Sequence, residues 1–319
     1  MAACSDENQY KDKTTSALIS ICRERGIKGY SRKRKDELIT LICSAPSTIA
    51  LPIAVAKNKS PLRYPGGKTR AIRILREFVQ RFYAGRTEVI SPFFGGGSFE
   101  LFLLANGIHR VFANDAFDLL INFWRAIAAN PQSVAEKVST ELPISKAKFA
   151  AIRALFTENG EQPILHSAEI AAAKYFIINR ASFSGSTFCG GYSAQAAKGR
   201  LNAAAIDAIR RVNLAGIEFS CANGVDFLAA HPQTEHSFVF ADPPYYLQKQ
   251  YLYGKDGDLH SSFDHAQFAA ALQKRNDWIL CYNDCQSIRD LYSTHQIFEV
   301  SWSYGMNKDK KSSEIIIVP

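Results

Sequence analysis

The sequence predicts an α/β fold built around a doubly wound, mostly parallel sheet. The run from Ser237 to Ala241 is apolar after its first residue, as in a strand buried on both faces of a parallel sheet. Residues 87–128 contain two short apolar segments separated by a glycine turn and a helical pattern, which is typical of a βαβ unit. A chain of 319 residues that is 47% hydrophobic and 21% charged can bury such a core.

Charge and cysteine usage restrict the class of protein. Residues 1–60 hold eleven Lys and Arg against five Asp and Glu, so +6 of the net charge of +8 lies there and favours a polyanionic partner. The seven cysteines form no CxxC pair and no metal-binding pattern, so we expect reduced thiols and no metal. A polar N-terminus and a short apolar run broken by Pro52 predict neither secretion nor a membrane span.

Residues 14–44 predict two short helices joined by a basic turn, after a polar tail at 1–13. Gly26 can end the first helix and Ser31 can cap the second. The segment resembles the SAP motif, a small DNA-binding element, and the resemblance implies phosphate contacts by four consecutive cations, Arg32, Lys33, Arg34 and Lys35. The alternative is a helical hairpin with a solvated charge run, although a helix N-terminus disfavours cations unless phosphates are present.

Residues 45–58 lack a clear period and contain two prolines, so we interpret them as a linker before a larger domain at 59–319. That domain opens with YPGGK. Gly66 and Gly67 let backbone approach a ligand closely, and Lys68 offers a cation at the start of a helix. The GxxxxGK spacing of a phosphate loop is absent.

The βαβ unit places an acid where a cofactor could bind. Glu88–Ser91 is predicted as a strand, PFFGGG as a turn, and Ser98 as the cap of a helix that ends near Gly107. A second strand, 111–113, leads to Asp115, which can accept hydrogen bonds from ribose hydroxyls. A dinucleotide site is the competing interpretation, and the missing GxGxxG spacing disfavours it.

Asp242 directly follows the buried strand and begins the tetrad Asp-Pro-Pro-Tyr. Ligands bind at the carboxyl ends of strands in open α/β sheets, so this carboxylate is placed for function. Pro243 and Pro244 stiffen the turn and leave carbonyl acceptors, while Tyr245 adds an aromatic face. A planar heterocycle with an amino group would match these groups; a stiff turn with a capping Asp is the alternative.

Residues 130–220 predict a long, mostly helical insertion that contains the glycine-rich stretch beginning NRASFSG. After the tetrad, Asp264 caps a further helix, and 278–282 and 314–318 predict strands that complete the sheet. We expect His265 to pack at the start of that helix rather than to act in catalysis.

The motifs together resemble the adenine-specific DNA methylases of the Dam type, which are class alpha amino-methyltransferases. Five stretches carry the resemblance, in the order YPGGK, PFFGGG with the later Asn-Asp, NRASFSG, NGVDF and DPPY. The order is informative, because in this class the target-recognition domain lies between the cofactor motif and the tetrad.

The resemblance implies a Rossmann-like methyltransferase sheet with an inserted target-recognition domain at 130–220. It implies an enzyme that transfers methyl from S-adenosylmethionine to the exocyclic amino group of a flipped-out adenine at a specific site in double-stranded DNA. The implied catalytic residues are Asp242, Pro243, Pro244 and Tyr245. The implied cofactor residues are Tyr64, Gly66, Gly67, Lys68, Phe94, Gly95, Gly97, Asp115, Asp226 and Asp242. Asn179, Arg180 and Ser184 either contact DNA or form a loop over the active site.

We also expect a metal-free monomer inside the cell, in cytoplasm, nucleoid or a viral replication compartment, with or without a cognate restriction endonuclease. Two alternatives stay open. One is methylation of a cytosine amino group or a protein amide. The other is a non-catalytic DNA-binding protein on a decayed methylase domain, against which the intact Asp242, Asp115 and glycine turn argue.

Overall fold

The computed structural model describes residues 10–11, 13–24, 30–31, 33–44, 58–157, 167–246, 262–301 and 313–319. The chain divides into two compact units, one of residues 1–55 and 73–84 and the other of 56–72 and 85–319. Gly26, Arg32 and most of the predicted tail and linker lie outside the described residues. No helix in the described part is long and apolar enough to cross a membrane.

The first unit contains the two predicted short helices, α2 (Thr15–Glu24) and α3 (Lys35–Ser44), together with α4 (Ile72–Phe82). Helices α2 and α3 share a small core that excludes water from their apolar stripes, formed by Tyr10, Leu18, Cys22, Leu38, Ile39 and Ile42. The Thr14 hydroxyl accepts a hydrogen bond from the Ala17 amide at 3.2 Å and so caps α2.

Helix α3 begins later than the sequence suggested. Its cap position is Arg34, not Ser31, and the Glu37 carboxylate accepts the Arg34 amide at 2.8 Å. Asp36 and Glu37 occupy the first turn, and Lys33 lies 3.6 Å from Glu37. These acids offset the helix dipole, so the cations before α3 do not need phosphates for the helix to form.

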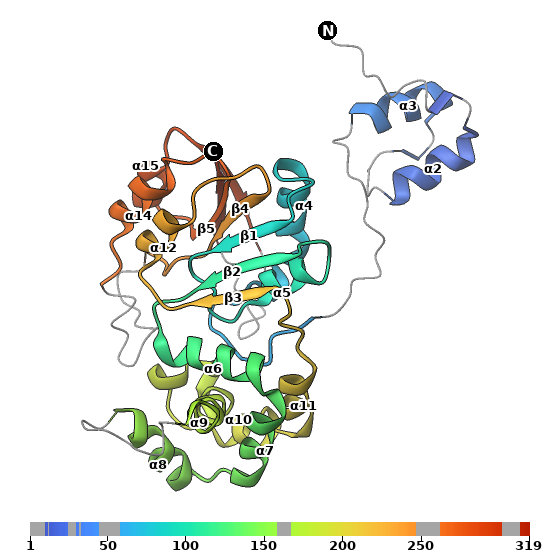
Figure 1. Ribbon diagram of the computed structural model, residues 1–319. Helices are drawn as coiled ribbons and strands as arrows, with labels where there is room; N and C mark the ends of the chain where they lie inside the picture. The colour runs from blue at the N-terminus through green and yellow to red at the C-terminus, as the bar shows by residue number, and fades with distance from the viewer. Residues whose placement is uncertain are drawn as a thin grey trace. The chain divides into compact units, whose positions relative to one another are not determined.

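The second unit is built on a seven-stranded sheet in the order β3-β2-β1-β4-β5-β7-β6 (Figure 1). Five neighbouring strands are parallel, and β7 runs antiparallel between β5 and β6. The strands are β1 (Glu88–Ser91), β2 (Arg110–Asn114), β3 (Ile217–Ser220), β4 (Ser237–Ala241), β5 (Trp278–Asn283), β6 (Gln296–Val300) and β7 (Glu314–Val318). The predicted doubly wound sheet is confirmed, and the strand order reverses between β1 and β4, where such folds bind ligands.

Helices cover both faces of the central strand β4, all five residues of which are buried. Val239 and Ala241 pack with α12 (Gly224–Ala230), α14 (His265–Leu272) and α15 (Gln286–Leu291). Phe240 points to the other face, where its ring lies 4.7 Å from Phe99 of α5 (Ser98–Leu104). Alternation along the strand therefore feeds two separate cores.

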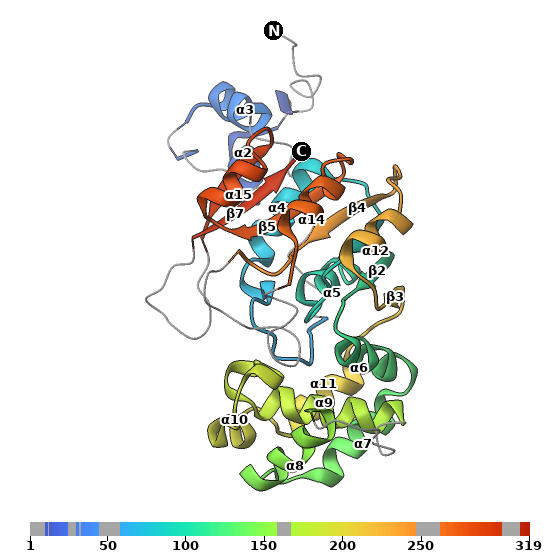
Figure 2. The same ribbon diagram turned by 90° about the vertical axis from the view of Figure 1, so that its left-hand side faces the viewer.

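A helical lobe joins the sheet beside β3 (Figure 1 and Figure 2). Helix α9 contacts most of the other helices of the lobe, and the rings of Phe123 and Phe176 stack at 5.9 Å between α6 and α9. The lobe comprises α6 (Asp118–Ala129), α7 (Pro131–Glu141), α8 (Lys146–Thr157), α9 (Ala168–Ala181), α10 (Ala194–Gly199) and α11 (Ala203–Arg211). It therefore starts before residue 130 and ends before 220, because α6 packs on α9 and β3 pairs with β2.

Candidate active site

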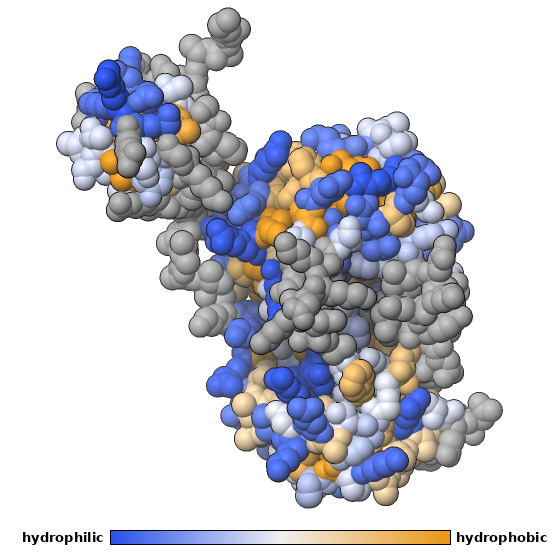
Figure 3. Space-filling view, turned by 180° about the vertical axis from the view of Figure 1, so that it is seen from behind, coloured by the Kyte–Doolittle hydropathy of each residue, from blue (hydrophilic) through white to orange (hydrophobic). Residues whose placement is uncertain are grey.

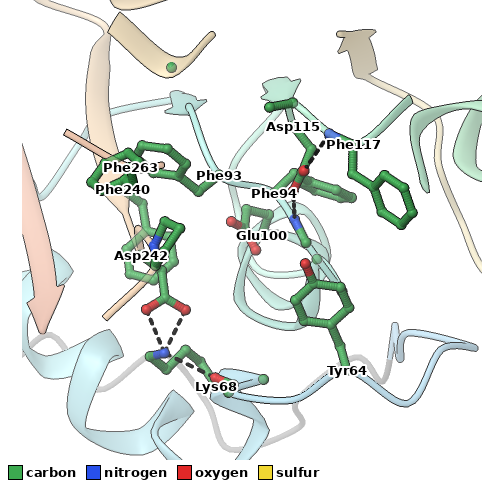
Figure 4. A pocket seen from close by; sticks show the side chains of 18 of the residues that line it. Tyr64, Lys68, Phe93, Phe94, Glu100, Asp115, Phe117, Phe240, Asp242 and Phe263 are labelled. Atoms are coloured by element: carbon green, nitrogen blue, oxygen red, sulfur yellow. Dashed lines mark hydrogen bonds and ion pairs between the residues drawn. The ribbon is translucent and has the colours of Figure 1, made fainter. Parts of the chain in front are cut away.

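A cavity opens at the carboxyl ends of β1, β2 and β4, where the strand order reverses (Figure 4). Its walls come from four loops that are distant in sequence: 64–68, 93–97, 115–117 and 242–244. The start of α12 and residues 262–267 complete it. The structure thus brings together most of the predicted cofactor and catalytic residues.

The glycine turn after β1 makes room for two aromatic rings. A Cβ at Gly95 would lie 2.8 Å from the Tyr64 ring, and one at Gly97 would lie 2.4 Å from the Phe94 ring. Gly95 and Gly97 also have φ values of 50° and 62°, which glycine adopts readily. Gly97 rather than Ser98 is the cap residue of α5. Larger residues in this turn would displace Tyr64 or Phe94 and close the cavity from beneath.

Of the two phenylalanines in the turn, Phe94 supports the loop from the core. It is 2% exposed, and its ring meets Trp124 edge-on at 5.2 Å. Phe93, which the sequence analysis did not single out, is half-buried in the cavity wall, with its ring 5.4 Å from Phe263. Gly224 is required beside it, because a Cβ there would lie 2.8 Å from the Phe93 ring.

Asp115 ties two of the cavity loops together. Its Oδ2 accepts the Gly95 amide at 2.9 Å and its Oδ1 accepts the Phe117 amide at 3.0 Å. Burial raises the pKa of Asp115 to about 6, and the amide hydrogen bonds oppose that rise. Each carboxylate oxygen keeps a lone pair, so Asp115 can still accept hydrogen bonds from ligand hydroxyls.

Asp242 lies on the opposite side of the cavity and is paired with Lys68. The Lys68 Nζ donates to Asp242 Oδ1 at 2.6 Å and Oδ2 at 2.5 Å, and also to the Gly66 carbonyl at 3.0 Å. The Lys68 side chain is only 3% exposed. Burial raises the pKa of Asp242, and the neighbouring ammonium opposes this. Lys68, predicted as a cofactor contact, is therefore paired with the carboxylate of the tetrad.

Tyr245 is held by a residue that the sequence analysis did not select. Its hydroxyl donates to Glu314 Oε2 at 2.5 Å, and Glu314, in β7, is 2% exposed. The Tyr245 ring also lies 6.1 Å from Tyr282 and 5.2 Å from the Lys68 ammonium. The aromatic face of the tetrad is therefore held in one orientation.

Glu100 is a second acid missing from the sequence prediction. It lies in the first turn of α5, lines the cavity, and is 2% exposed. Burial raises its pKa to about 7, while the Ser91 hydroxyl, which donates to Glu100 Oε1 at 2.7 Å, opposes that rise. A GGGSFE stretch could have drawn attention to it, but helix-start acids are common for dipole reasons alone.

Three of the predicted catalytic and cofactor residues, Asp226, Pro243 and Tyr245, do not line the cavity. Asp226 is exposed on α12, and its neighbours Asn223 and Val225 line the cavity instead. His265 packs against aromatic rings and its Nδ1 lies 2.7 Å from the Tyr282 hydroxyl. This contact supports the packing interpretation of His265.

Asn179, predicted to contact DNA or to form a loop over the active site, has a structural role instead. The side chain is fully buried, accepts the Arg63 amide at 2.9 Å, and donates to the Arg63 carbonyl at 2.7 Å. It also donates to the Gly185 carbonyl and the Thr187 hydroxyl. Asn179 therefore pins the loop before Tyr64 to the turn after α9, and its side chain is not accessible to DNA.

Basic residues gather around this pin. Arg180 donates to the carbonyls of Arg200 and Pro61, and burial, with Arg63 and Arg200 nearby, lowers its pKa to about 10. Burial and Arg200 also lower the pKa of Arg63. In this arginine cluster, Arg63, Arg180 and Arg200, burial first and like charge second disfavour the charged forms of Arg63 and Arg180.

The turn beside the arginine cluster carries an exposed ring. Phe183 is 63% exposed, and the next residue, Ser184, adopts a left-handed conformation with φ 61°. Figure 3 shows hydrophilic side chains over much of the visible face of the helical lobe. An exposed aromatic next to arginines is typical of surfaces that bind nucleic acid.

No group of three His, Cys, Asp or Glu residues in the described part of the chain is arranged to hold a metal ion. Comparison with protein-family models matches residues 64–306 to the D12 class N6 adenine-specific DNA methyltransferases. Residues 9–45 match the N-terminal domain of the Rho termination factor, and not the SAP motif. A search of curated proteins found no match.

Proposed function

The chain belongs to the D12 class of N6 adenine-specific DNA methyltransferases, and from this premise we propose how its residues divide the reaction. The family methylates adenine in DNA and implies S-adenosylmethionine as the methyl donor and a flipped-out target base. It excludes neither a solitary enzyme nor one beside a restriction endonuclease, and it favours adenine over the cytosine and amide alternatives. We propose a monomer, because all the described residues that line the cavity come from one chain, and we propose that it acts inside the cell, where its DNA substrate lies.

Asp242 and Pro243 are proposed to hold the target amine. The adenine N6 lone pair is delocalised into the ring, so the amine is a poor nucleophile. Hydrogen bonds from its two N–H groups to the Asp242 carboxylate and the Pro243 carbonyl favour a more tetrahedral nitrogen and stabilise the positive charge that develops on it. Pro243 and Pro244 keep these acceptors stiff, which holds the amine in line for transfer.

Tyr245 is proposed to stack on the flipped base. Extrusion of a base from a duplex costs a few kcal/mol, and an aromatic face recovers part of it. The hydrogen bond to Glu314 fixes the ring before the base arrives. A preoriented ring loses less side-chain entropy on binding than a mobile one.

The other end of the cavity fits the methyl donor. When bound, S-adenosylmethionine supplies an activated methyl group on a sulfonium. Asp115 is proposed to accept its ribose hydroxyls, while Phe93 and Val225 provide apolar walls for its adenine. Glycine at positions 95 and 224 lets the Tyr64 and Phe93 rings line this end of the cavity, because a Cβ at either position would meet those rings.

DNA is proposed to contact the arginine cluster and Phe183, with the helical lobe selecting the site. The basic segment before α3, Lys33 and Arg34, together with Lys35 at the first position of the helix, is proposed to add phosphate contacts that do not read sequence. Arg32 belongs to the same proposal but lies outside the described residues. Residues 9–45 match a Rho N-terminal domain and not a SAP motif, and they still form a compact pair of helices.

The observation that carries the proposal is a single cavity with Asp242 at one end and Asp115 at the other. We expect Asp242→Ala to reduce methyl transfer by at least about a hundredfold and to change cofactor affinity by less than about tenfold. Asp115→Ala should weaken cofactor binding first. Tritium transfer to unmethylated DNA and calorimetric cofactor titration measure the two effects. Equal losses of cofactor binding in both variants would show that the roles are wrongly assigned.

A further inference from the structure

Lys68 occupies the carboxylate that the target amine needs. Its ammonium lies 2.6 and 2.5 Å from the two Asp242 oxygens, on a side chain that is 3% exposed. If an adenine amine takes Asp242 as its acceptor, the buried ammonium loses its main counter-charge. The hydrogen bond to the Gly66 carbonyl supplies no full opposite charge, and a buried ammonium is costly without one, so a second carboxylate in the cavity would compensate for the loss of Asp242.

Glu100 is placed to be that acceptor. It lies in the wall of the same cavity, is 2% exposed, and interacts electrostatically with both Lys68 and Asp242 (Figure 4). Its side-chain partner among the described residues is the Ser91 hydroxyl, which engages one oxygen. The flexible four-carbon stem of a lysine allows its ammonium to exchange partners while Cα stays fixed.

We propose that Lys68 is an exchangeable counter-ion, which holds Asp242 before the target base arrives and moves to Glu100 when the adenine amine takes its place. Glu100 is then a positioning residue for methyl transfer. This inference rests on the proposed role of Asp242. It explains why the cavity places a buried carboxyl group, Glu100, and a partly buried one, Asp242, near one buried lysine.

The exchange predicts a pH dependence with a defined sign. Burial raises the pKa of Glu100 to about 7, and Glu100 must lose its proton to receive the Lys68 ammonium. Capture of the amine should therefore strengthen as pH rises through about 7. Asp242 and the buried Cys281 thiol, whose pKa is raised well above its ordinary value by burial, face the same region. A Glu100 variant separates its titration from theirs.

The test isolates the amine itself. Affinities are measured for a duplex that carries adenine at the methylated position and for one that carries purine, which lacks the 6-amino group. The ratio of the two dissociation constants reports capture of the amine. The cost of opening each duplex is the same for every variant, so it cancels when the ratios of two proteins are compared. We expect Glu100→Gln to lower this adenine preference by about tenfold, and wild-type but not Glu100→Gln protein to gain preference with rising pH.

A double-mutant cycle supplies the decisive comparison. In a Lys68→Met background there is no ammonium to relocate, so Glu100→Gln should change the adenine preference by less than about twofold. Glu100→Asp should restore part of the preference, and Glu136→Gln, an exposed acid on α7, should leave it unchanged. Thermal unfolding of each variant checks that the fold is retained.

Three outcomes would overturn the inference or its premise. Additive effects of Lys68→Met and Glu100→Gln would show that Lys68 does not move to Glu100. A pH profile unchanged by Glu100→Gln would show the same. If Asp242→Ala left the adenine preference intact, the proposed function of Asp242 would fail; if it removed the preference while Glu100→Gln did not, only the exchange would fail.

Discussion

At the scale of single residues, acids that look alike in the sequence have different surroundings. Asp115 accepts two backbone amides, Asp242 is paired with a buried lysine, and Asp226 is exposed on a helix. The pKa of a carboxyl group depends on the hydrogen bonds that it accepts, on nearby charges and on how much water reaches it. The three acids differ in their hydrogen-bond partners, in nearby charge and in access to water, which is why we propose different roles for Asp115 and Asp242.

Cofactor affinity should fall in mild acid because of Asp115. Its pKa is raised to about 6, so the ionised form that accepts ribose hydroxyls is complete above that pH and is lost as pH falls through it. We expect S-adenosylmethionine affinity to drop by up to about tenfold per pH unit below that value. Calorimetric titration across pH measures this. Asp115→Asn protein should bind weakly and without the dependence; a flat wild-type profile would contradict the prediction.

Glu314 should act on the reaction only through Tyr245. Loss of either residue removes their part-buried 2.5 Å hydrogen bond, at a cost of about 1.5–3 kcal/mol because the acceptor is a carboxylate. We expect Glu314→Leu to lower methyl transfer and stability, and Glu314→Gln, which retains an acceptor, to lower both less. In a Tyr245→Phe background the Glu314→Gln effect should largely vanish. If Glu314→Gln and Tyr245→Phe affected methyl transfer independently, Glu314 would not act through Tyr245.

At the scale of elements, loops that look functional in sequence turn out to be fastened by side chains from other elements. Asn179 of α9 fixes the loop that carries Tyr64, and Asn114 of β2 donates to the carbonyls of Pro92 and Ala222, joining the loops after β1 and β3. Buried amides suit this task because each combines donors and an acceptor. Hydrogen bonds from these two buried side chains therefore tie together the loops around the cavity.

Substitutions of Asn179 and Arg200 should have different effects, the first on stability and the second on DNA binding. Asn179→Ala leaves several buried backbone groups unpaired, so we expect a loss of about 2 to 4 kcal/mol in the free energy of unfolding. Arg200→Gln, at an exposed position, should keep stability and flatten the slope of log affinity against log salt by about one unit. Urea unfolding and salt-dependent DNA binding distinguish the two. If Asn179→Ala flattened the salt slope and Arg200→Gln did not, Asn179 would be the DNA contact and Arg200 would not.

At the scale of the whole molecule, the chain combines a compact basic helical pair with a catalytic unit that holds the entire cavity. Residues 1–60 carry +6 of the net charge of +8. Phosphate contacts raise affinity without reading bases, whereas selection of a site needs contacts near the flipped base. We therefore expect the two units to contribute separately.

The basic segment before α3 should supply affinity but not specificity. Replacement of Lys33, Arg34 and Lys35 by Gln should flatten the salt slope by roughly 0.9 for each cation that contacts phosphate and weaken binding at moderate salt. The methylated sequence should stay the same, and low salt should restore activity. Deletion of residues 1–50 should have the same effects. A changed methylation site would show that this segment contributes to specificity. An unchanged salt slope would show that it does not contact DNA.

Strands and motifs were predictable because they follow from local pattern. β1, β4 and β7 have the predicted bounds, and both Asp115 and Asp242 lie at the carboxyl ends of parallel strands as expected. An apolar run of five residues is almost forced into a buried strand, and the edge that follows it is fixed by the sheet. The fold class and the two ends of the cavity were thus contained in the sequence.

Partners were decided only by the tertiary structure. Lys68 meets Asp242 across 174 residues, Tyr245 meets Glu314 across 69, and Asn179 meets Arg63 across 116. Glu100 reads as an ordinary acid at a helix start until α5 packs on the sheet and buries it. Local sequence records the periodicity of an element, but burial and pairing depend on which elements meet in space, and these two factors set the charge state of every acid in the site.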